Sequence, residues 1–335
     1  MTTPPDPTPE RPPGPAAGEH QLDPAGTGDP TVQNPMVQNP IGAVPALPDP
    51  AALLDNHGRA GRDLPKAIAV GVGIGVACIL SLLFFNWGFV LIMAVGLVLG
   101  SIEVHQALSR LGMRSAIVPI VVGTVAIVGG SYLAGRQDPE QVPSNTILLG
   151  ALALTVIAAL IWRMPQGQEN YVRDTAASLF IIGYLPLLGS FASLMLAGDH
   201  GAARIVTYIL VVVCSDLGGY AAGVLFGKHP MAPRISPKKS WEGLVGSVLL
   251  GIAAGVAMVL LGLHVAWWVG VVLGVVLVAI GVCGDLIESM IKRDVGIKDM
   301  SSFLPGHGGV MDRLDSLLLA APAAWLIMYL LVPGG

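Results

Sequence analysis

Long apolar runs constrain this chain more than any other feature of its sequence. Nine of them lie between residues 67 and 332, most near the length, about 20 residues, that a helix needs to cross a bilayer. Because lipid offers no partner to backbone N–H and C=O groups, such runs must be helical. Apolar residues make up 53% of the chain and charged residues 12%, which excludes a soluble globular protein. We predict an all-α, polytopic integral membrane protein with about nine transmembrane helices.

The nine predicted spans set the layout of the chain. The second is short, and Pro119 and Pro186 lie inside the third and fifth, where proline favours a kink. The spans are Ala67–Phe85, Gly88–Ile102, Ser115–Ala134, Asn145–Trp162, Thr175–Ala197, Ile205–Phe226, Leu244–Leu263, Val265–Cys283 and Ser316–Val332. We divide them into an N-terminal group, residues 64–200, and a C-terminal catalytic region, residues 201–335.

Residues 1–63 form a tail of different composition. Fourteen of the 26 prolines of the chain lie at or before Pro50, and we expect no cleavable signal peptide because no early apolar run is present. A polar, proline-rich segment buries too little apolar surface to offset chain entropy, so we predict that the tail is disordered. A plain cytoplasmic extension is favoured over a partner-binding tail.

Charge orients the predicted spans. With the N-terminus inside, 16 of the 18 lysines and arginines fall on the cytoplasmic side, and only Arg136 and Arg204 fall outside. Loops rich in Lys and Arg remain on the cytoplasmic side of a membrane. We therefore predict a cytoplasmic N-terminus, a location in the cell inner (plasma) membrane, and cytoplasmic loops at residues 227–243 and 284–315, where nucleotides are available.

The densest polar stretch joins the last two spans. Ionisable groups at membrane depth are costly and rare without a partner or a task. If the preceding helix continues through Lys292, then Asp285, Ser289 and Lys292 share one face. Asp312 and Asp315 likewise share a face at the start of the last helix. Carboxylates from two helices can hold a hard divalent cation that also binds phosphate oxygens.

Between these helices lies the segment Pro305-Gly-His-Gly-Gly309, which cannot be regular helix. Its glycines allow backbone amides to approach a ligand closely and could form an anion-binding nest. Four cationic side chains nearby suit a polyphosphate: Lys292, Arg293, Lys298 and Arg313. A charged loop that only orients the protein is the alternative, and the two acid pairs with the glycine–histidine core disfavour it.

Two further regions carry polar groups of interest. Asp216 lies midway along the sixth span, where a lone carboxylate needs a cation or a hydrogen-bonding partner. The basic loop at residues 227–243 fits a positive-inside anchor, but it also holds groups suited to phosphates or anionic headgroups: Ser236, Lys238, Lys239 and Ser240. Glu103 is expected to snorkel from the end of the second span to the membrane interface.

The stretch from Ser289 to Asp315 resembles the signature of the phosphatidate cytidylyltransferases, also called CDP-diacylglycerol synthases. Every defining position of that signature is present: Ser289, Lys292, Arg293, Lys298, Asp299, Pro305, His307, Gly308, Gly309, Asp312, Arg313 and Asp315. Ile235–Gly243 is similar to a second stretch of this family, with Ser240 where threonine is more common. Asp216 and Tyr220 match a third, looser stretch. The earlier spans are similar only in hydropathy and general layout.

The resemblance implies a Mg²⁺-dependent nucleotidyltransferase of phospholipid biosynthesis that converts CTP and phosphatidate to CDP-diacylglycerol and pyrophosphate. The catalytic residues it implies are Asp285, Ser289, Lys292, Lys298, His307, Asp312, Arg313 and Asp315. The substrate-binding residues it implies are Ser236, Lys238, Lys239, Ser240, Arg293, Gly308 and Gly309. Mg²⁺ is expected on Asp285, Asp312 and Asp315, and Asp216 would complete a second site for a monovalent or divalent cation.

The expected partners are CTP, phosphatidate and membrane lipids, with a homodimer left open and no feature that indicates nucleic acid. Two alternatives remain. One is a cytidylyltransferase for another lipid phosphate, of the polyprenyl type. The other is a secondary transporter, which intramembrane Asp216 and the glycine-interrupted spans would fit. The ionisable residues cluster on one face and do not line a path across the membrane, which disfavours transport.

Overall fold

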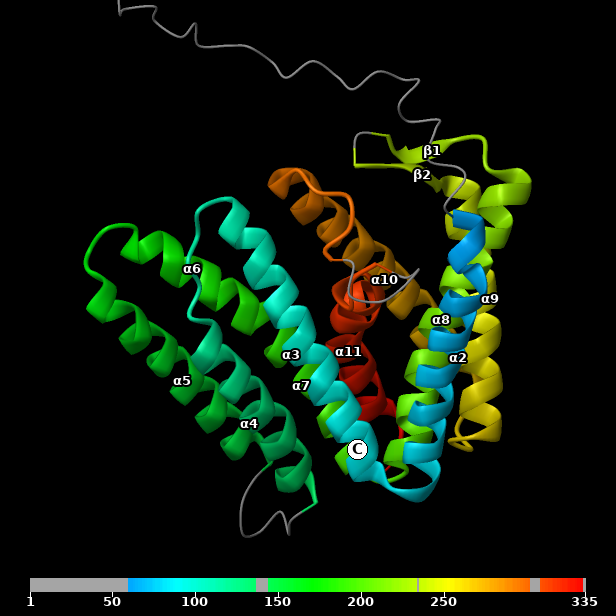
Figure 1. The fold of residues 1–335 in the computed structure, drawn as a ribbon. Helices are drawn as coiled ribbons and strands as arrows, with labels where there is room; N and C mark the ends of the chain where they lie inside the picture. The colour runs from blue at the N-terminus through cyan, green and yellow to red at the C-terminus, as the bar shows by residue number, and fades with distance from the viewer. Residues whose placement is uncertain (1–59, 137–143, 234, 302–307, 334–335) are drawn as a thin grey trace, which may run out of the picture. The chain divides into compact units, whose positions relative to one another are not determined.

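The computed structural model describes residues 60–136, 144–233, 235–301 and 308–333 (Figure 1). The predicted tail lies outside these ranges except for its last residues, which already belong to the first described helix. Its disorder and its function therefore stay predictions. The division of the spans at residue 200 stays a prediction as well.

Helices make up almost all of the described chain. Its elements are α2 (Ala60–Phe84), α3 (Asn86–Arg110), α4 (Ile117–Gly135), α5 (Ser144–Arg163), η2 (Met164–Gln166), α6 (Tyr171–Ile182), η3 (Gly183–Leu187), α7 (Leu188–Ala197), α8 (Gly201–Phe226), β1 (Pro230–Ala232), β2 (Ser236–Ser240), α9 (Trp241–Leu261), α10 (Trp267–Val295) and α11 (Met311–Leu331). The two strands form an antiparallel hairpin, which the all-α prediction missed.

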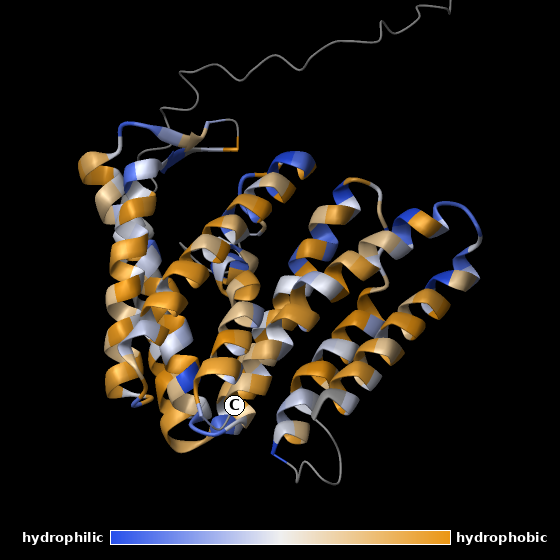
Figure 2. Cartoon of the chain, turned by 180° about the vertical axis from the view of Figure 1, so that it is seen from behind, coloured by the Kyte–Doolittle hydropathy of each residue, from blue (hydrophilic) through white to orange (hydrophobic). Residues whose placement is uncertain are grey.

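Eight helical segments of the described residues are long and apolar enough to cross a membrane. They correspond to the second through ninth predicted spans. The first predicted span corresponds to α2, whose described apolar part, Gly71–Phe84, is shorter. Apolar residues run along the helices, and hydrophilic ones gather toward helix ends and loops (Figure 2). The prediction of a polytopic helical membrane protein is confirmed.

Two spans differ from their predicted form. Helix α3 is not short, because it continues beyond Ile102 to Arg110. The fifth span is a composite of α6, η3 and α7, and η3 is a π-helical turn that contains Pro186. Proline cannot donate the hydrogen bond of a regular α-helix, and a π-turn absorbs such a local defect. The predicted irregularity at Pro186 is therefore a widened turn.

Helices α8, α9 and α10 follow one another in sequence and pack side by side (Figure 1). Small residues make this packing close. A Cβ atom on Gly218 of α8 would lie 2.5 Å from the carbonyl oxygen of Gly246 of α9, and one on Gly246 would lie 2.6 Å from the carbonyl oxygen of Gly218. Lipid tails are as apolar as leucine, so membrane helices associate largely through such backbone contact.

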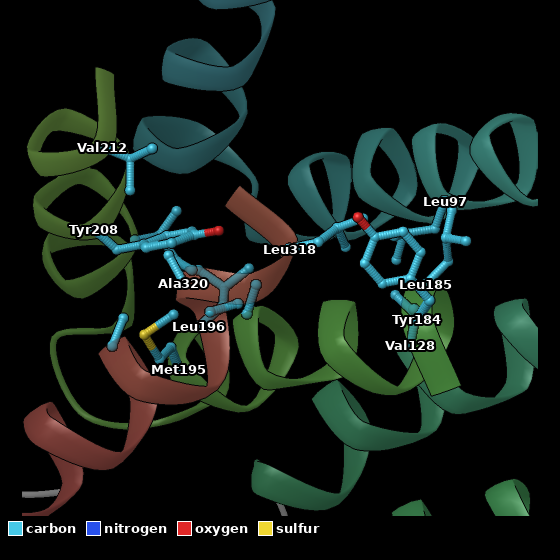
Figure 3. Packing of buried hydrophobic residues seen from close by; sticks show 14 of the residues in the cluster. Leu97, Val128, Tyr184, Leu185, Met195, Leu196, Tyr208, Val212, Leu318 and Ala320 are labelled. Atoms are coloured by element: carbon cyan, nitrogen blue, oxygen red, sulfur yellow. The ribbon is translucent and has the colours of Figure 1, made fainter. Parts of the chain in front are cut away.

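Helix α11 is central to the buried core. Tyr208 of α8 lies beside Ala320 of α11, while Tyr184 of η3 lies beside Leu97 of α3 and Leu185 (Figure 3). The Tyr208 hydroxyl donates a hydrogen bond to the carbonyl oxygen of Leu317, at 2.5 Å. This bond links α8 to α11 within the main apolar core, to which Tyr208 belongs.

Replacement Tyr208→Phe should lower the free energy of unfolding by about 0.5–1.5 kcal/mol, the net value of one buried hydrogen bond. Tyr329→Phe is the matched control, because the Tyr329 side chain is 52% exposed and stacks on Trp325. Reversible unfolding in mixed detergent micelles measures both variants. Equal stability of the two variants would contradict a stabilising role for the Tyr208 hydroxyl.

Candidate active site

A cavity of about 350 Å³ lies where α8, the hairpin, α9 and α10 meet. Predicted site residues from three separate stretches of sequence line it: Asp216 of α8, Ser236, Lys238, Lys239 and Ser240 of β2, and Asp285 of α10. Tyr220 also lines it and is 72% exposed. The fold thus brings six of the predicted site residues to one place.

The hairpin is held firmly over this cavity. Ser240 is the N-cap of α9, and its hydroxyl accepts a hydrogen bond from the amide of Gly243 at 3.1 Å. Glu242 accepts from the backbone amides of Lys228 and His229, and lies 2.6 Å from the His229 ring. The loop of residues 227–243 is therefore a capped hairpin and the start of a helix, with its basic side chains in fixed register.

Asp285 is the link between the hairpin and α10. It accepts a hydrogen bond from the Lys239 ammonium at 2.5 Å and another from the Ser316 hydroxyl of α11. Both side chains of the Lys239–Asp285 pair are about a quarter exposed. Asp216 interacts electrostatically with both members of this pair. The Lys239 ammonium and the carboxylates of Asp216 and Asp285 therefore lie together in the cavity, which Lys238 also lines.

Helix α10 continues beyond its predicted end at Cys283 and through Lys292 to Val295, so Asp285, Ser289 and Lys292 lie on one helix; its C-cap is Gly296, which has a φ of +74°. Asp285 lies ten residues, or about 15 Å of helix, before the last residue of α10. The predicted loop at residues 284–315 is therefore wrong at both ends, since α10 and α11 include its first and last residues. Asp285 therefore lies well inside α10, whereas Asp312 lies in the first turn of α11.

A second cluster lies along α10 next to the start of α11. The Lys292 ammonium is 2.9 Å from Glu288 and 3.0 Å from Asp312. Asp315 interacts directly with both Glu288 and Asp285, so it joins this cluster to the cavity. Sequence analysis missed Glu288. Its spacing, three residues after Asp285 and four before Lys292, was the available signal.

Close contact between α10 and α11 brings the acids together. A Cβ atom on Gly284 would lie 2.6 Å from the carbonyl oxygen of Asp315. Only glycine allows the two backbones to approach this closely beside Asp285. The glycine therefore sets the separation of Asp285 from the acids of α11.

At the start of α11, backbone amides donate hydrogen bonds to carboxylates of the protein itself. The amide of Gly309 donates to Asp312 at 2.7 Å, and the amides of Val310 and Met311 donate to Glu103 of α3 at 2.9 and 2.8 Å. Within the predicted nest, the described amide of Gly309 thus binds a carboxylate of the chain itself. The expectation that Glu103 snorkels is wrong: its side chain is buried, because the amides of Val310 and Met311 satisfy it.

The remaining predicted residues differ in their surroundings. Ser289 is half-buried on α10, and Gly308 lies next to Asp312 with a φ of +80°. His307 lies outside the described residues. Three predicted cationic residues are exposed: Arg293, Lys298 and Arg313.

The cytidylyltransferase family profile matches residues 65–331. The chain belongs to the cytidylyltransferase family. Proteins named phosphatidate cytidylyltransferase are similar to it over most of its length. The one from Mycobacterium tuberculosis H37Rv is 38% identical over 323 residues, which cover 92% of each chain. The one from Mycobacterium leprae is 39% identical over 82% of this chain and 91% of its own, and the one from Helicobacter pylori is 34% identical over 62% and 82%.

Membership of this family confirms that the chain is an enzyme, a nucleotidyltransferase. It favours this function over the secondary transporter. The match extends from the start of the apolar region to the end of α11, so it includes the N-terminal spans that were similar only in hydropathy.

The acid cluster of this cytidylyltransferase is suited to a cation. Carboxylate oxygens are the ligands that hard divalent cations prefer. Two buried polar atoms beside the cluster, Glu288 Oε1 and the Tyr184 hydroxyl, have no hydrogen-bond partner within the described part of the chain. Tyr184 interacts electrostatically with Glu288, Asp315 and Asp285. Among the described residues, however, no three His, Cys, Asp or Glu side chains are arranged as ligands of one ion.

Replacement Gly284→Ala should lower cytidylyltransferase activity about 100-fold, because displacement of catalytic groups by 1 Å has effects of that size. The added methyl group would push α11 away from α10 at Asp315. Gly281→Ala, one turn earlier, is the matched control, since its Cβ would meet only the Ser316 Cβ at an ordinary 3.7 Å. Steady-state rates of both variants, purified in detergent, test this. Equal rates would show that the approach at Gly284 is not needed.

Proposed function

We propose that this chain is a phosphatidate cytidylyltransferase, which converts CTP and phosphatidate to CDP-diacylglycerol and pyrophosphate. The observation that carries the proposal is the cavity in which Lys239 and Asp285 meet among membrane-spanning helices. It combines cations for phosphates, carboxylates for a metal ion and apolar surroundings for a lipid. The names of the relatives that match over more than nine-tenths of the chain support the same substrates.

The apolar surface around the cavity supports a lipid as one substrate. Tyr220, Val224 and Phe226 of α8 and Trp241 of α9 are all more than half exposed. In a bilayer these side chains would face acyl chains. We infer that phosphatidate enters sideways from the inner leaflet, with its phosphate toward Lys239. The relatives' names favour phosphatidate over a polyprenyl phosphate, which such apolar helices would also accept.

Charge neutralisation is the main task of the site. The lipid phosphate is already ionised near neutral pH, so its oxygen needs no strong general base to attack the α-phosphorus of CTP. As that bond forms, the bond from the α-phosphorus to the bridging oxygen breaks and pyrophosphate leaves. Lys238 and Lys239 would contact phosphate oxygens in the cavity, while the exposed Arg293, Lys298 and Arg313 would hold the triphosphate or the leaving pyrophosphate.

The acids of α10 and α11 would hold Mg²⁺. Asp315 interacts with both Asp285 and Glu288, and Asp312 shares Lys292 with Glu288. Asp216 is the candidate for a second cation. Mg²⁺ supplies charge neutralisation and alignment of the phosphates when it is bound. The ammonium group of Lys239 neutralises Asp285, and that of Lys292 neutralises Glu288 and Asp312. When metal and nucleotide bind, these ion pairs would separate. The carboxylates would then bind the cation, and the ammonium groups would bind phosphate.

The proposal includes a location and an orientation. The chain is a multi-pass membrane protein. The distribution of Lys and Arg supports an orientation with the cavity and hairpin on the cytoplasmic face, where CTP is present. We propose the plasma membrane as the location. His307, the substrate contacts of Gly308 and Gly309, and a homodimer stay predictions.

Incorporation of radiolabelled CTP tests substrates and metal together. Purified protein with phosphatidate and Mg²⁺ should transfer label to lipid and release pyrophosphate, and excess chelator should abolish both, because the site depends on divalent charge. A polyprenyl phosphate at the same concentration is the comparison substrate. Preferential labelling of the polyprenyl lipid, or no labelling of either lipid, would overturn the proposed function.

Replacements Asp285→Asn and Asp312→Asn should each reduce turnover to background, while insertion into the membrane is unaffected. Each removes one negative charge from the proposed metal site and leaves the side-chain volume unchanged. Asp294→Asn is the control, because Asp294 is an exposed acid on the same helix as Asp285. The incorporation assay on equal amounts of membrane-inserted protein measures all three. Near-normal turnover of Asp285→Asn or Asp312→Asn would remove that residue from the site.

A further inference from the structure

Glu103 is a buried carboxylate on α3, far in sequence from every motif of the site. Its side chain is 4% exposed. One oxygen, Oε1, accepts from the amide of Val310 at 2.9 Å and from the Ser301 hydroxyl at 2.5 Å. The other, Oε2, accepts from the amide of Met311 at 2.8 Å. The carboxylate therefore binds residues on both sides of positions 302–307: Ser301 before them, and Val310 and Met311 after them.

These contacts suit a charged group at the start of a helix. The first amides of a helix have no partner within it, and the helix dipole places positive potential there. Val310 immediately precedes α11, and Met311 is its first residue. A carboxylate has two acceptor oxygens and a negative charge, whereas the neutral amide of the same size has one acceptor oxygen. Glu103 is thus the cap of α11, supplied by a different helix.

The cap lies directly beside a proposed metal ligand. A Cβ atom on Gly309 would lie 2.7 Å from Glu103 Oε2 and 3.1 Å from Asp312 Oδ2. Two like-charged carboxylates therefore flank one glycine. Their repulsion is offset because the amides of Gly309, Val310 and Met311 lie between them and donate to one or the other. The position of Asp312 then depends on that of Glu103.

The same cap bears on the rest of the acid cluster. Met311 is fully buried, so the first turn of α11 is fixed in the core as well as by its hydrogen bonds. Asp312 follows Met311 directly, and Asp315 lies one turn further on. Any rotation of this turn would move both acids relative to Glu288 and Lys292 of α10.

We propose that Glu103 is a positioning residue of the active site: by capping α11 it sets Asp312 and Asp315 in place for the metal ion and the nucleotide. This inference rests on the proposed function for the identity of the nucleotide. Glu103 itself need not contact substrate. Glu103 acts through the positions of Asp312 and Asp315, the acids that serve the metal ion and the nucleotide.

Replacement Glu103→Gln tests the inference with a readout independent of turnover. Glutamine keeps the size of the side chain, but its NH₂ group cannot accept from a backbone amide. Mn²⁺ binding to the purified protein, measured by electron paramagnetic resonance, should weaken by about 10- to 100-fold, as expected when a group that orients metal ligands is lost. The Mg²⁺ concentration for half-maximal activity should rise by a similar factor, and saturating Mg²⁺ should restore most of kcat.

Asp174→Asn is the matched control. Asp174 is also a buried carboxylate, paired with Arg163 at 2.7 Å and with the amide of Arg114 at 2.8 Å, and none of these residues belongs to the site. This variant should lose thermal stability but keep wild-type Mn²⁺ affinity. If Glu103→Gln does not fold, Glu103→Asp retains the charge with a shorter reach and should show a smaller shift in the same direction.

The outcomes separate this inference from the proposed function. Wild-type Mn²⁺ affinity in a folded Glu103 variant would overturn the positioning role, as would an equal loss of affinity in Asp174→Asn. Failure of the wild-type protein to transfer CMP to phosphatidate would overturn the proposed function alone. The comparison of Mn²⁺ affinities would still decide the role of Glu103.

Discussion

Ionised side chains inside membrane-spanning helices are stable only where neighbours neutralise or hydrogen-bond them. The site depends on this constraint throughout. Asp285 is satisfied by Lys239 and Ser316, and Asp312 by Lys292 and backbone amides. Their side-chain partners come from the hairpin, α10 and α11, so these acids are satisfied only when those elements are assembled. The charges that serve the chemistry therefore also specify the packing of the helices.

The hydropathy of the chain was enough to predict its class and most of its spans. The extension of α10 through Lys292 also followed from spacing, since Asp285, Ser289 and Lys292 recur at helical intervals. The hairpin at residues 230–240 did not, because short strands that pair only with each other leave little periodic signal. The length of α3 was underestimated because Glu103 and His105 look like the end of a span when their partners are unknown.

The sequence singled out polar residues within recognisable stretches and missed those that only tertiary contact brings to the candidate site. Lysines of the hairpin, Asp216 and Asp285 were each singled out by residue type and depth, and they line one cavity. Glu103 and Tyr184 come from the N-terminal spans, and nothing local distinguishes them from residues at helix ends or in the core. Their relation to α11 and the acid cluster is a long-range one that no pattern within a span encodes.

The ion pair between Glu288 and Lys292 has a consequence for biogenesis. The two residues lie four apart on α10, so the pair forms within a single helix and needs no other part of the fold. As the chain leaves the ribosome, α10 can carry its own countercharge into the lipid before α11 has been synthesised. The translocon thus meets a segment with fewer unpaired charges than its sequence suggests, and Asp312 can pair with Lys292 once α11 has been synthesised.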